Sequence, residues 1–348
     1  MSAESSSSGL AVPLSPRRGF WHGILLATCF FAAAAVTASL IDGNLPFPSV
    51  PEISPRFRYF AQHKNEFDTI FIGSSRIRHQ VIPEQFDREV GEKGRHVRSF
   101  NLGYSGMWPP ESYYYLRQVL ALRPKKLRWV ILELMDYRFG QVEGQVTTMR
   151  SVYWHDAKHT AMAFRLVVEL PLPAMEKLKL VAGHAQLFLQ RMANLGRGAE
   201  WLQARYFSNK KKTDMSWVKR SGFDPEPLGE WSESAKTEFK RQILAFEQAP
   251  PVERLRPGLA IALREIDWQV RQAGAELILV VPPTVRPEER LAPVPPNAFG
   301  FFAFDNPTEY PRLYLPELHY DPGHLNEAGA REFTSLVAQR FVTLLQTW

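Results

Sequence analysis

The chain has 348 residues, of which 45% are hydrophobic and 22% are charged, with a formal net charge of +6. This composition is typical of globular proteins and excludes a largely disordered or fibrous chain, while the length allows one large α/β core or two smaller ones. The single cysteine, Cys29, excludes disulfides and cysteine-ligated metals within one chain, and without a nucleic-acid motif or long basic stripe we expect no nucleic-acid partner.

The N-terminal region predicts a membrane anchor. Residues 1–18 are Ser-rich without apolar periodicity and predict a disordered cytoplasmic tail. Residues 19–41 contain no Asp, Glu, Lys or Arg and are long enough to cross a hydrocarbon core of roughly 30 Å. Because Arg17 and Arg18 flank this run, we expect the N-terminus in the cytoplasm and the main domain in the periplasm or another extracytoplasmic space. A cleaved signal peptide and a buried core helix are the alternatives.

The residues that follow predict an α/β domain from residue 59 to 348. Residues 42–58 contain four prolines and predict an extended linker. Short β-branched and aromatic runs predict strands within residues 67–73, 96–103, 127–135 and 275–283. Helical patterns accompany them at residues 83–90, 110–122 and 258–273. This alternation predicts a parallel sheet that is covered by helices on both faces.

Two further regions complete the predicted architecture. Residues 325–346 have apolar residues at helical spacing, with Asn326 placed as the N-cap of a last helix. Residues 140–255 interrupt the alternation with helical stretches, such as 199–207 and 234–246, and show no clear strand. We expect a mostly helical insertion over the C-terminal edge of the sheet, where such folds bind ligands. An independent second domain is the alternative.

A turn at Gly73-Ser74-Ser75 follows the first predicted strand. Groups at the carboxyl ends of parallel strands face the ligand crevice, and Gly73 lets the backbone turn there. A serine in such a turn can act as a nucleophile beside backbone N–H groups that hold an oxyanion, provided that a base activates it. Asp321 and His324 lie three residues apart around Pro322-Gly323. In a turn, the carboxylate can orient the imidazole and leave its other nitrogen free for Ser75.

Three short blocks resemble the SGNH (GDSL-type) hydrolase superfamily. IFIGSSR resembles the first block, with Ser75 at the nucleophile position and Ser74 where Asp often stands; FNLGYSG and YDPGHLN resemble the second and the last. The resemblance implies a three-layer α/β/α fold with a Ser75–His324–Asp321 triad and an oxyanion hole from the amides of Ser75 and Gly106. It implies no metal or cofactor. Ser74 stays the competing nucleophile.

The chain departs from that family after the third predicted strand. The family usually has a Gly-x-Asn-Asp turn whose Asn donates to the oxyanion, whereas here Met135-Asp136 follows. One donor is therefore missing or replaced by Arg76 or by a group from the insertion. The chain looks similar to membrane-anchored members with this same departure, which assist membrane-bound O-acyltransferases in D-alanylation of lipoteichoic acid and O-acetylation of alginate.

The resemblance implies a membrane-anchored component that transfers an acyl group, such as acetyl, to a cell-envelope glycan or exopolysaccharide through a seryl ester. A multi-spanning O-acyltransferase is the implied partner. Two alternatives remain: an esterase or lipase that uses the same residues to release acyl groups into water, and a non-catalytic scaffold for the membrane partner.

Several other residues have both a functional and a structural interpretation. Ser74, Arg76, Asp136 and His319 are candidates for the pocket, and His79 is expected on the surface or at the pocket rim. His155 and His159 could chelate a metal at i, i+4 spacing, but without a third ligand a solvent-facing helix is the preferred interpretation. Trp108 and residues 113–115, three tyrosines, could stack on a sugar, although core packing is more common at this spacing.

Overall fold

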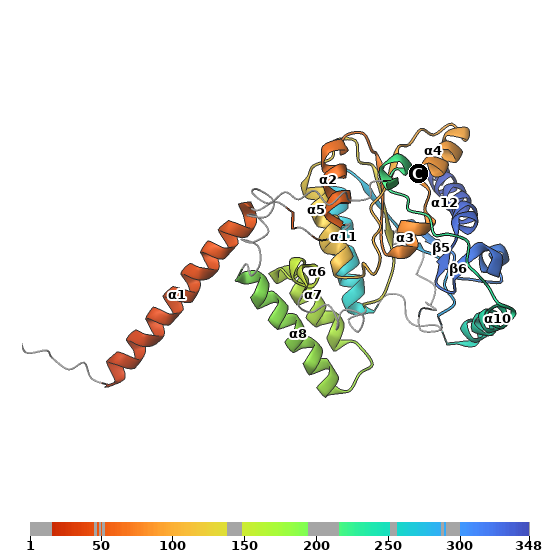
Figure 1. Ribbon diagram of the computed structural model, residues 1–348. Coiled ribbons are helices and arrows are strands. Elements are labelled where there is room, and N and C mark those ends of the chain that lie inside the picture. The colour runs from red at the N-terminus through yellow and green to blue at the C-terminus, as the bar shows by residue number, and fades with distance from the viewer. Residues whose placement is uncertain are drawn as a thin grey trace, which may run out of the picture.

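The computed structural model describes residues 16–44, 47, 48, 50, 53–137, 148–193, 216–250, 256–286, 289 and 300–347. Helix α1 (Pro16–Asn44) projects from the rest of the molecule as a single rod (Figure 1). Its stretch Phe20–Ala38 is long and apolar enough to cross a membrane and is not buried against protein. The predicted apolar N-terminal helix is therefore confirmed, and it begins at Pro16, inside the predicted tail. A signal sequence would show the same features, and residues 1–15 lie outside the described residues.

A parallel sheet forms the centre of the described structure. Its five strands are β1 (Thr69–Ile72), β2 (Ser99–Asn101), β3 (Trp129–Glu133), β4 (Glu276–Val281) and β5 (Gly300–Ala303). The strand order is β2-β1-β3-β4-β5, and every neighbouring pair is parallel. The four predicted strands are confirmed. β5 was not predicted because it is a short edge strand in which alternate residues are only half-buried.

Helices cover both faces of this sheet, as predicted. Successive strand residues point to opposite faces, so Ile70 and Ile72 join one core while Phe71 joins the other. The first core contains residues of α2 (Ile53–His63), α5 (Glu111–Ala121) and α11 (Pro257–Gln272). The second contains residues of α4 (Pro83–Glu92), α10 (Glu233–Gln248) and α12 (Glu327–Thr347). The arrangement is a three-layer α/β/α architecture (Figure 1).

The linker prediction is wrong at its C-terminal end. Residues 53–58 form the first half of α2, and Ile53 and Phe57 are buried in the core. Val50 is buried as well, and Phe47 stacks on Phe57 with ring centroids 4.1 Å apart. The aromatic and aliphatic residues between the prolines therefore pack against the domain. The folded part begins before residue 59.

The insertion is helical in its described part. It contains α6 (Met149–Tyr153), α7 (Ala157–Val168), α8 (Ala174–Met192), a 3₁₀ turn at Ser216–Arg220 and α10. Residues 148–193 and 216–250 contain no strand. The helix expected at 234–246 is confirmed as α10, whereas the one expected at 199–207 lies outside the described residues. Figure 1 shows α7 and α8 near α1, and α10 at the other side of the molecule.

The strand order identifies where ligands bind in such a sheet. The chain moves from β1 outward to β2, and then returns past β1 to β3. The two directions part between the carboxyl ends of β1 and β3, which is the topological switch point where open α/β sheets hold their ligands. Gly73-Ser74-Ser75 follows β1, and Glu133 ends β3. The serine turn therefore lies at the switch point.

Candidate functional site

Three side chains from distant parts of the chain form a hydrogen-bonded row at the switch point. The hydroxyl oxygen of Ser75 lies 2.8 Å from Nε2 of His324. On the other side of the imidazole, Nδ1 lies 2.9 Å from each carboxylate oxygen of Asp321. The structure thus brings together the three residues that the sequence singled out.

Local backbone chemistry fixes the position of Ser75. A Cβ on Gly73 would lie 2.5 Å from the Glu133 carboxylate and 2.5 Å from Ile77, so only glycine fits there. Ser74 is the N-cap of α3 (Ser75–Gln80), and its hydroxyl accepts a hydrogen bond from the amide of Arg76. Ser75 is the first helical residue, so its amide has no carbonyl partner within the helix. This amide is available to an oxyanion.

The competing serine has a structural task. Ser74 is buried, and its hydroxyl is already engaged as the cap of α3. Its amide donates to Oε2 of Glu133 at 2.5 Å. Ser74 is therefore part of the turn that presents Ser75, and its side chain does not face His324 as that of Ser75 does.

A β-hairpin turn holds the histidine and the aspartate. Strands β6 (His319–Asp321) and β7 (His324–Leu325) are antiparallel, and Asp321 pairs with His324. The amide of Gly323 donates to the Asp321 carboxylate at 2.6 Å, which fixes the carboxylate inside the turn. Asn326 then caps α12, since its side chain accepts from the amide of Gly329. The predicted N-cap is confirmed.

Packing of α12 brings this turn to Ser75. The helix contacts α3 and α4. Thr334 of α12 accepts from the amide of Ile82 and donates to the carbonyl of Gln80, so it ties α12 to the loop after α3. Because β7 also contacts α3, the turn is held at the N-terminal end of the segment that contains Ser75.

The protonation states within the row follow from its partners. Burial raises the pKa of Asp321, but the hydrogen bond and charge of His324 and the backbone amides outweigh it, so the pKa lies below its ordinary value. An ionised carboxylate only accepts hydrogen bonds, so Nδ1 of His324 must be the donor. In the neutral ring Nε2 is then an acceptor, and the Ser75 hydroxyl donates to it. This is the arrangement that general-base activation of a serine requires.

A buried charge network lies beneath the serine turn. Arg76 donates to Glu133 at 2.9 Å and to Glu289 at 2.7 Å, and Thr284 also donates to Glu289. Burial alone lowers the pKa of the Arg76 guanidinium, but Glu289 and Glu133 outweigh it and raise that pKa. Arg76 is therefore a scaffold residue rather than a free pocket cation. Glu133 was missed by the sequence interpretation, although an acid at the end of a wholly apolar strand was a usable signal.

Gly106 occupies a turn beside the Gly73-Ser74-Ser75 turn. The amide of Tyr104 donates to the carbonyl of Gly73, and the amide of Met107 donates to the carbonyl of Tyr104. Gly106 has φ of +68° in that turn, which glycine adopts without strain. A Cβ on Gly106 would lie 3.6 Å from the Arg150 guanidinium. Arg150 comes from α6 of the insertion, and it makes two 3.1 Å hydrogen bonds to Glu111.

Asp136 and His319 have structural partners. Asp136 is bonded to Arg256 and accepts from the amide of Tyr137, so it organises the loop after β3. His319 is buried, with Nε2 2.7 Å from the carbonyl of Leu313. Burial lowers the pKa of His319 despite its backbone hydrogen bonds. These partners leave both residues as supports of the candidate site.

Of the two places expected for His79, the surface is wrong, whereas a position beside the candidate site agrees with the structure. His79 is buried on α3, and its ring centroid lies 6.3 Å from that of His324 in an edge-to-face arrangement. Its Nδ1 lies 2.6 Å from the carbonyl of Asp224, and its Nε2 lies 3.4 Å from Glu226. Burial lowers the pKa of His79 to about 4. Asp224 and Glu226 come from the insertion, and no local sequence pattern marked them.

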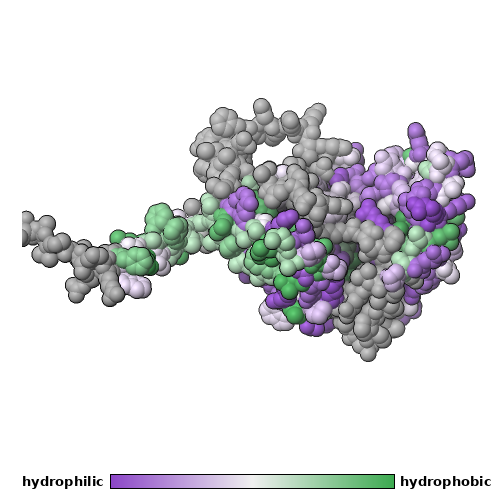
Figure 2. Space-filling view, turned by 90° about the horizontal axis from the view of Figure 1, so that it is seen from below, coloured by the Kyte–Doolittle hydropathy of each residue, from purple (hydrophilic) through white to green (hydrophobic). Residues whose placement is uncertain are grey.

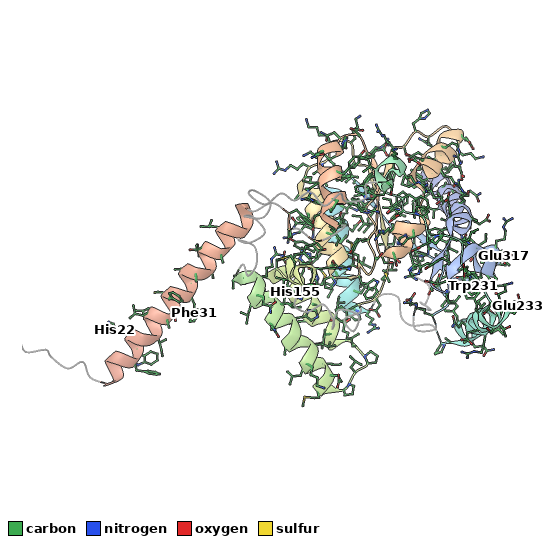
Figure 3. The ribbon with its side chains drawn as sticks, viewed as in Figure 1. His22, Phe31, His155, Trp231, Glu233 and Glu317 are labelled. Atoms are coloured by element: carbon green, nitrogen blue, oxygen red, sulfur yellow. The ribbon has the colours of Figure 1, made fainter. Side chains whose placement is uncertain are left out.

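The same insertion segment also braces the hairpin turn. The indole of Trp231 donates to the carbonyl of His319 at 3.0 Å. Figure 3 shows Trp231 on this side of the molecule, near Glu317 and Glu233. Because residues 224–231 contact both α3 and β6, they join the two halves of the candidate site.

The interpretation of His155 and His159 as residues of a solvent-facing helix was wrong. Both are buried, and only His159 lies in α7, because His155 precedes that helix. Nδ1 of His155 lies 2.6 Å from the Ser151 carbonyl, and its Nε2 lies 2.8 Å from Nδ1 of His184. Nε2 of His184 lies 2.6 Å from the Tyr137 hydroxyl. Burial lowers the pKa of His184 to about 4, and that of His155 still further with His184 as a second cause.

The structure also does not support a metal site at His155 and His159. Among the described residues, no group of three or more His, Cys, Asp or Glu side chains could hold a metal ion. His159 is hydrogen-bonded to Asp156, the N-cap of α7. Trp108 and the tyrosines at 113–115 are buried and belong to the cores, as their spacing indicated.

A cavity of about 630 Å³ lies next to the Asp321 turn. Its lining includes Arg241 and Glu238 of α10, Arg286 after β4, and the turn itself. The rest of the lining is Gln242, Ala245 and Val285, and more of the cavity surface is apolar than polar. Ser75 and His324 do not line this cavity, so it meets the hydrogen-bonded row only at Asp321.

No family model matches this chain, and no curated protein matches it.

Proposed function

We propose that this protein is a membrane-anchored, SGNH-like serine acyltransferase component that moves an acyl group to a cell-envelope glycan. The observation that carries the proposal is the row Ser75–His324–Asp321 at the switch point, with 2.8 and 2.9 Å between its polar atoms. A nucleophile, a base that it contacts and a carboxylate that orients the base are the three elements of serine acyl transfer.

The chemistry runs in two steps. In the first, the Ser75 oxygen attacks the carbonyl carbon of an acyl ester while Nε2 of His324 takes the hydroxyl proton. The tetrahedral intermediate collapses, the leaving alcohol receives that proton from His324, and a seryl ester remains. In the second, His324 removes the proton of a sugar hydroxyl, whose oxygen attacks the seryl ester. The bond to Ser75 breaks, and His324 returns the proton to the Ser75 oxygen. Asp321 stays ionised and stabilises the imidazolium in both steps.

Two backbone amides are proposed to hold the oxyanion, those of Ser75 and Gly106. The position of Ser75 at the start of α3 and the turn that holds Gly106 beside Gly73 support this assignment. The loop after β3 supplies no asparagine for a third donor, since Asp136 is bonded to Arg256. Arg150 is the insertion residue that reaches the Gly106 turn. Loss of one donor can cost about 10²–10³ in rate, so a slow transferase fits this site better than a fast hydrolase.

Two observations support a glycan acceptor at a membrane. Helix α1 has the length and composition of a membrane anchor, which would hold the domain at the envelope surface. The cavity beside Asp321 contains the charged side chains of Glu238, Arg241 and Arg286, which can form hydrogen bonds with sugar hydroxyls. A multi-spanning membrane protein that delivers the acyl group is the proposed partner.

Covalent labelling tests the catalytic part of the proposal. The purified full chain is treated with a fluorophosphonate, which reacts with activated serines, and the modified residue is mapped by mass spectrometry. We expect label on Ser75, strong reduction of that label in His324→Ala, and retention in Ser74→Ala. Absence of label on Ser75 in the folded protein would favour a non-catalytic scaffold.

Transfer and hydrolysis are separated by the fate of the acyl group. With an activated acetyl ester as donor, we expect acetate to form slowly in buffer and acetyl-sugar to form when a polysaccharide is added. Acetate formation that the polysaccharide leaves unchanged, without acetyl-sugar, identifies an esterase instead.

A further inference from the structure

Exposed hydrophobic side chains are concentrated in one helical hairpin. Outside α1, ten large hydrophobic residues of the described chain are exposed, and five of them lie between residues 168 and 189. These five are Val168, Leu172, Met175, Leu178 and Leu189. The other five are scattered singly, as is usual on protein surfaces. The hairpin of α7 and α8 therefore presents an apolar surface that the other described residues do not cover.

Helix α8 has two different faces. Met175, Leu178, Ala182 and Leu189 are exposed, and at 3.6 residues per turn they fall within a sector of roughly 60°. We call these four residues the α8 stripe. The opposite face contains His184 and Leu187, which are buried. Since α8 packs by one face only, its outer apolar face has no protein partner among the described residues.

The α8 stripe lies close to the membrane anchor. Helix α8 contacts α1, and Figure 1 shows α8 ending beside the domain end of α1 and running away from it across the molecule. Figure 2, seen from below, shows hydrophobic residues gathered on the part of the domain nearest to α1. Helix α7 lies on the domain side of α8, because α7 and α8 contact each other and α7 also contacts α11.

The expected position of α8 relative to the bilayer follows from the length of α1. The apolar stretch Phe20–Ala38 has 19 residues, or about 28 Å at 1.5 Å per residue, which matches a hydrocarbon core. A helix that contacts the domain end of such an anchor and runs across it lies at the level of the lipid headgroups. An amphipathic helix in that plane buries its apolar face at the boundary of the acyl chains.

Basic residues complete the pattern of an interfacial helix. Lys179 flanks the α8 stripe and forms an exposed ion pair with Glu176 at 3.2 Å. Lys177 donates to the carbonyl of Val168 in the same hairpin, and Arg165 is exposed on α7. Long basic side chains can place their charge among lipid phosphates while their stems cover apolar surface. A phospholipid surface therefore satisfies both the apolar stripe and its rim.

We propose that the α7–α8 hairpin is a second membrane contact, in which the α8 stripe inserts into the interface of the bilayer that α1 spans. This inference rests on the proposed anchoring by α1 and does not depend on acyl chemistry. Two contacts fix the tilt of the domain, whereas a single helix leaves it free to rotate. The hairpin would thus hold the switch point at a constant height above the membrane.

Depth-dependent quenching in vesicles tests this proposal with the full chain. In a Cys29→Ser background, single cysteines replace Leu178 and, as a matched control, Leu244 on α10; the two side chains are 60% and 57% exposed. Each cysteine is labelled with an environment-sensitive fluorophore, and the protein is reconstituted in phosphatidylcholine–phosphatidylglycerol vesicles. Lipids with a spin label on the acyl chain serve as the quencher.

We expect blue-shifted emission and at least a twofold stronger quenching at position 178 than at position 244. Equal quenching at the two positions in protein that floats with the vesicles would overturn the proposal and leave the anchor intact. Protein that fails to float would overturn both the anchor and the hairpin contact. Fluorophosphonate labelling of Ser75 in the same samples reports separately on the proposed active site and on the fold.

Discussion

The molecule contains two histidine clusters that use the same atoms in opposite ways. His324 lies between a hydroxyl and a carboxylate, and its side chain is 24% exposed. His155 and His184 are buried and bonded to each other, to a backbone carbonyl and to a tyrosine hydroxyl. A hydrogen-bonded histidine can act as a base only where a neighbouring group also stabilises its protonated, positively charged form.

The difference is visible in how each ring nitrogen is used. At His324, a proton taken by Nε2 is compensated by the ionised Asp321 on the other side. In the buried cluster the Ser151 carbonyl requires a donor, so Nδ1 of His155 carries the proton and its Nε2 accepts from His184. His184 then accepts from Tyr137. A further proton on either ring would add a charge in a buried site, and burial therefore lowers the pKa of both histidines. We therefore assign this cluster a structural role.

Replacement of Ser75 should give the largest effect on activity. We expect Ser75→Ala to lower acyl transfer by about 10⁴–10⁶-fold, since the covalent step loses its nucleophile. Ser74→Ala loses only a helix cap, with a cost of about 0.5–2 kcal/mol in stability. Steady-state rates with an activated acyl ester, beside thermal melts of both variants, check this pair. Equal activity losses in both variants would contradict the assignment.

Removal of the carboxylate should have the next largest effect. Asp321→Asn keeps the size of the side chain but can no longer fix the Nδ1–H tautomer of His324 or stabilise its charge. We expect kcat to fall by about 10²–10⁴-fold. The test is kcat and fluorophosphonate labelling rate measured on the same preparation. A variant with wild-type kcat would show that Ser75, His324 and Asp321 do not work as a triad.

Replacement of His184 in the buried histidine cluster should affect stability more than replacement of His324 does. His184→Ala removes the hydrogen bonds that His184 makes with His155 and Tyr137 and opens a cavity, so we expect a loss of about 2–5 kcal/mol in unfolding free energy. His324→Ala, at a partly exposed position, should cost less than about 1 kcal/mol while abolishing activity. Denaturant unfolding of both variants in detergent, together with Ser75 labelling of the folded protein, measures the two effects.

Acid should act on the buried cluster before it acts on Asp321. The folded pKa of His184 is lowered to about 4, so its stability contribution is complete above the unfolded pKa of about 6.5 and is lost as pH falls toward 4. In that window this group adds a slope of up to about 1.4 kcal/mol per pH unit. His184→Gln should reduce the slope.

Asp321 provides the contrast within the same titration. Its folded pKa is lowered, so its contribution is present above its unfolded value near 3.9 and is lost only at still lower pH. Melting temperatures of the wild type and of His184→Gln between pH 7 and 4.5 therefore isolate the buried cluster. Parallel curves for the two proteins would contradict the buried, neutral state.

The sequence was most informative where one local pattern decides the structure. Apolar β-branched runs predicted β1 to β4, and the turn residues Pro322 and Gly323 predicted the turn between Asp321 and His324. β5 and α2 were missed because their residues pack only when the rest of the core is present. Phe57, for example, lies in a proline-rich segment that reads as a linker until its stacking on Phe47 is seen.

The candidate site was predictable in its reacting residues and not in its supports. Ser75, His324 and Asp321 lie in short turns with their own sequence signals. Asp224, Glu226 and Glu289 come from regions without strand or helix periodicity, and their partners are far away in the chain. His155 was misread because a pair at i, i+4 suggests one helix face, whereas the helix begins after it. Long-range packing, which no local spacing encodes, decided these positions.

The distance along the chain between Ser75 and His324 has a consequence for biogenesis. The two residues are 249 positions apart, and the imidazole reaches the hydroxyl only after α12 has packed on α3 and α4. If the domain is exported, as the proposed orientation of α1 requires, Ser75 emerges from the translocation channel long before His324. Under the proposed acyl chemistry, a chain still in the channel then has no activated serine and does not react with acyl groups of the envelope.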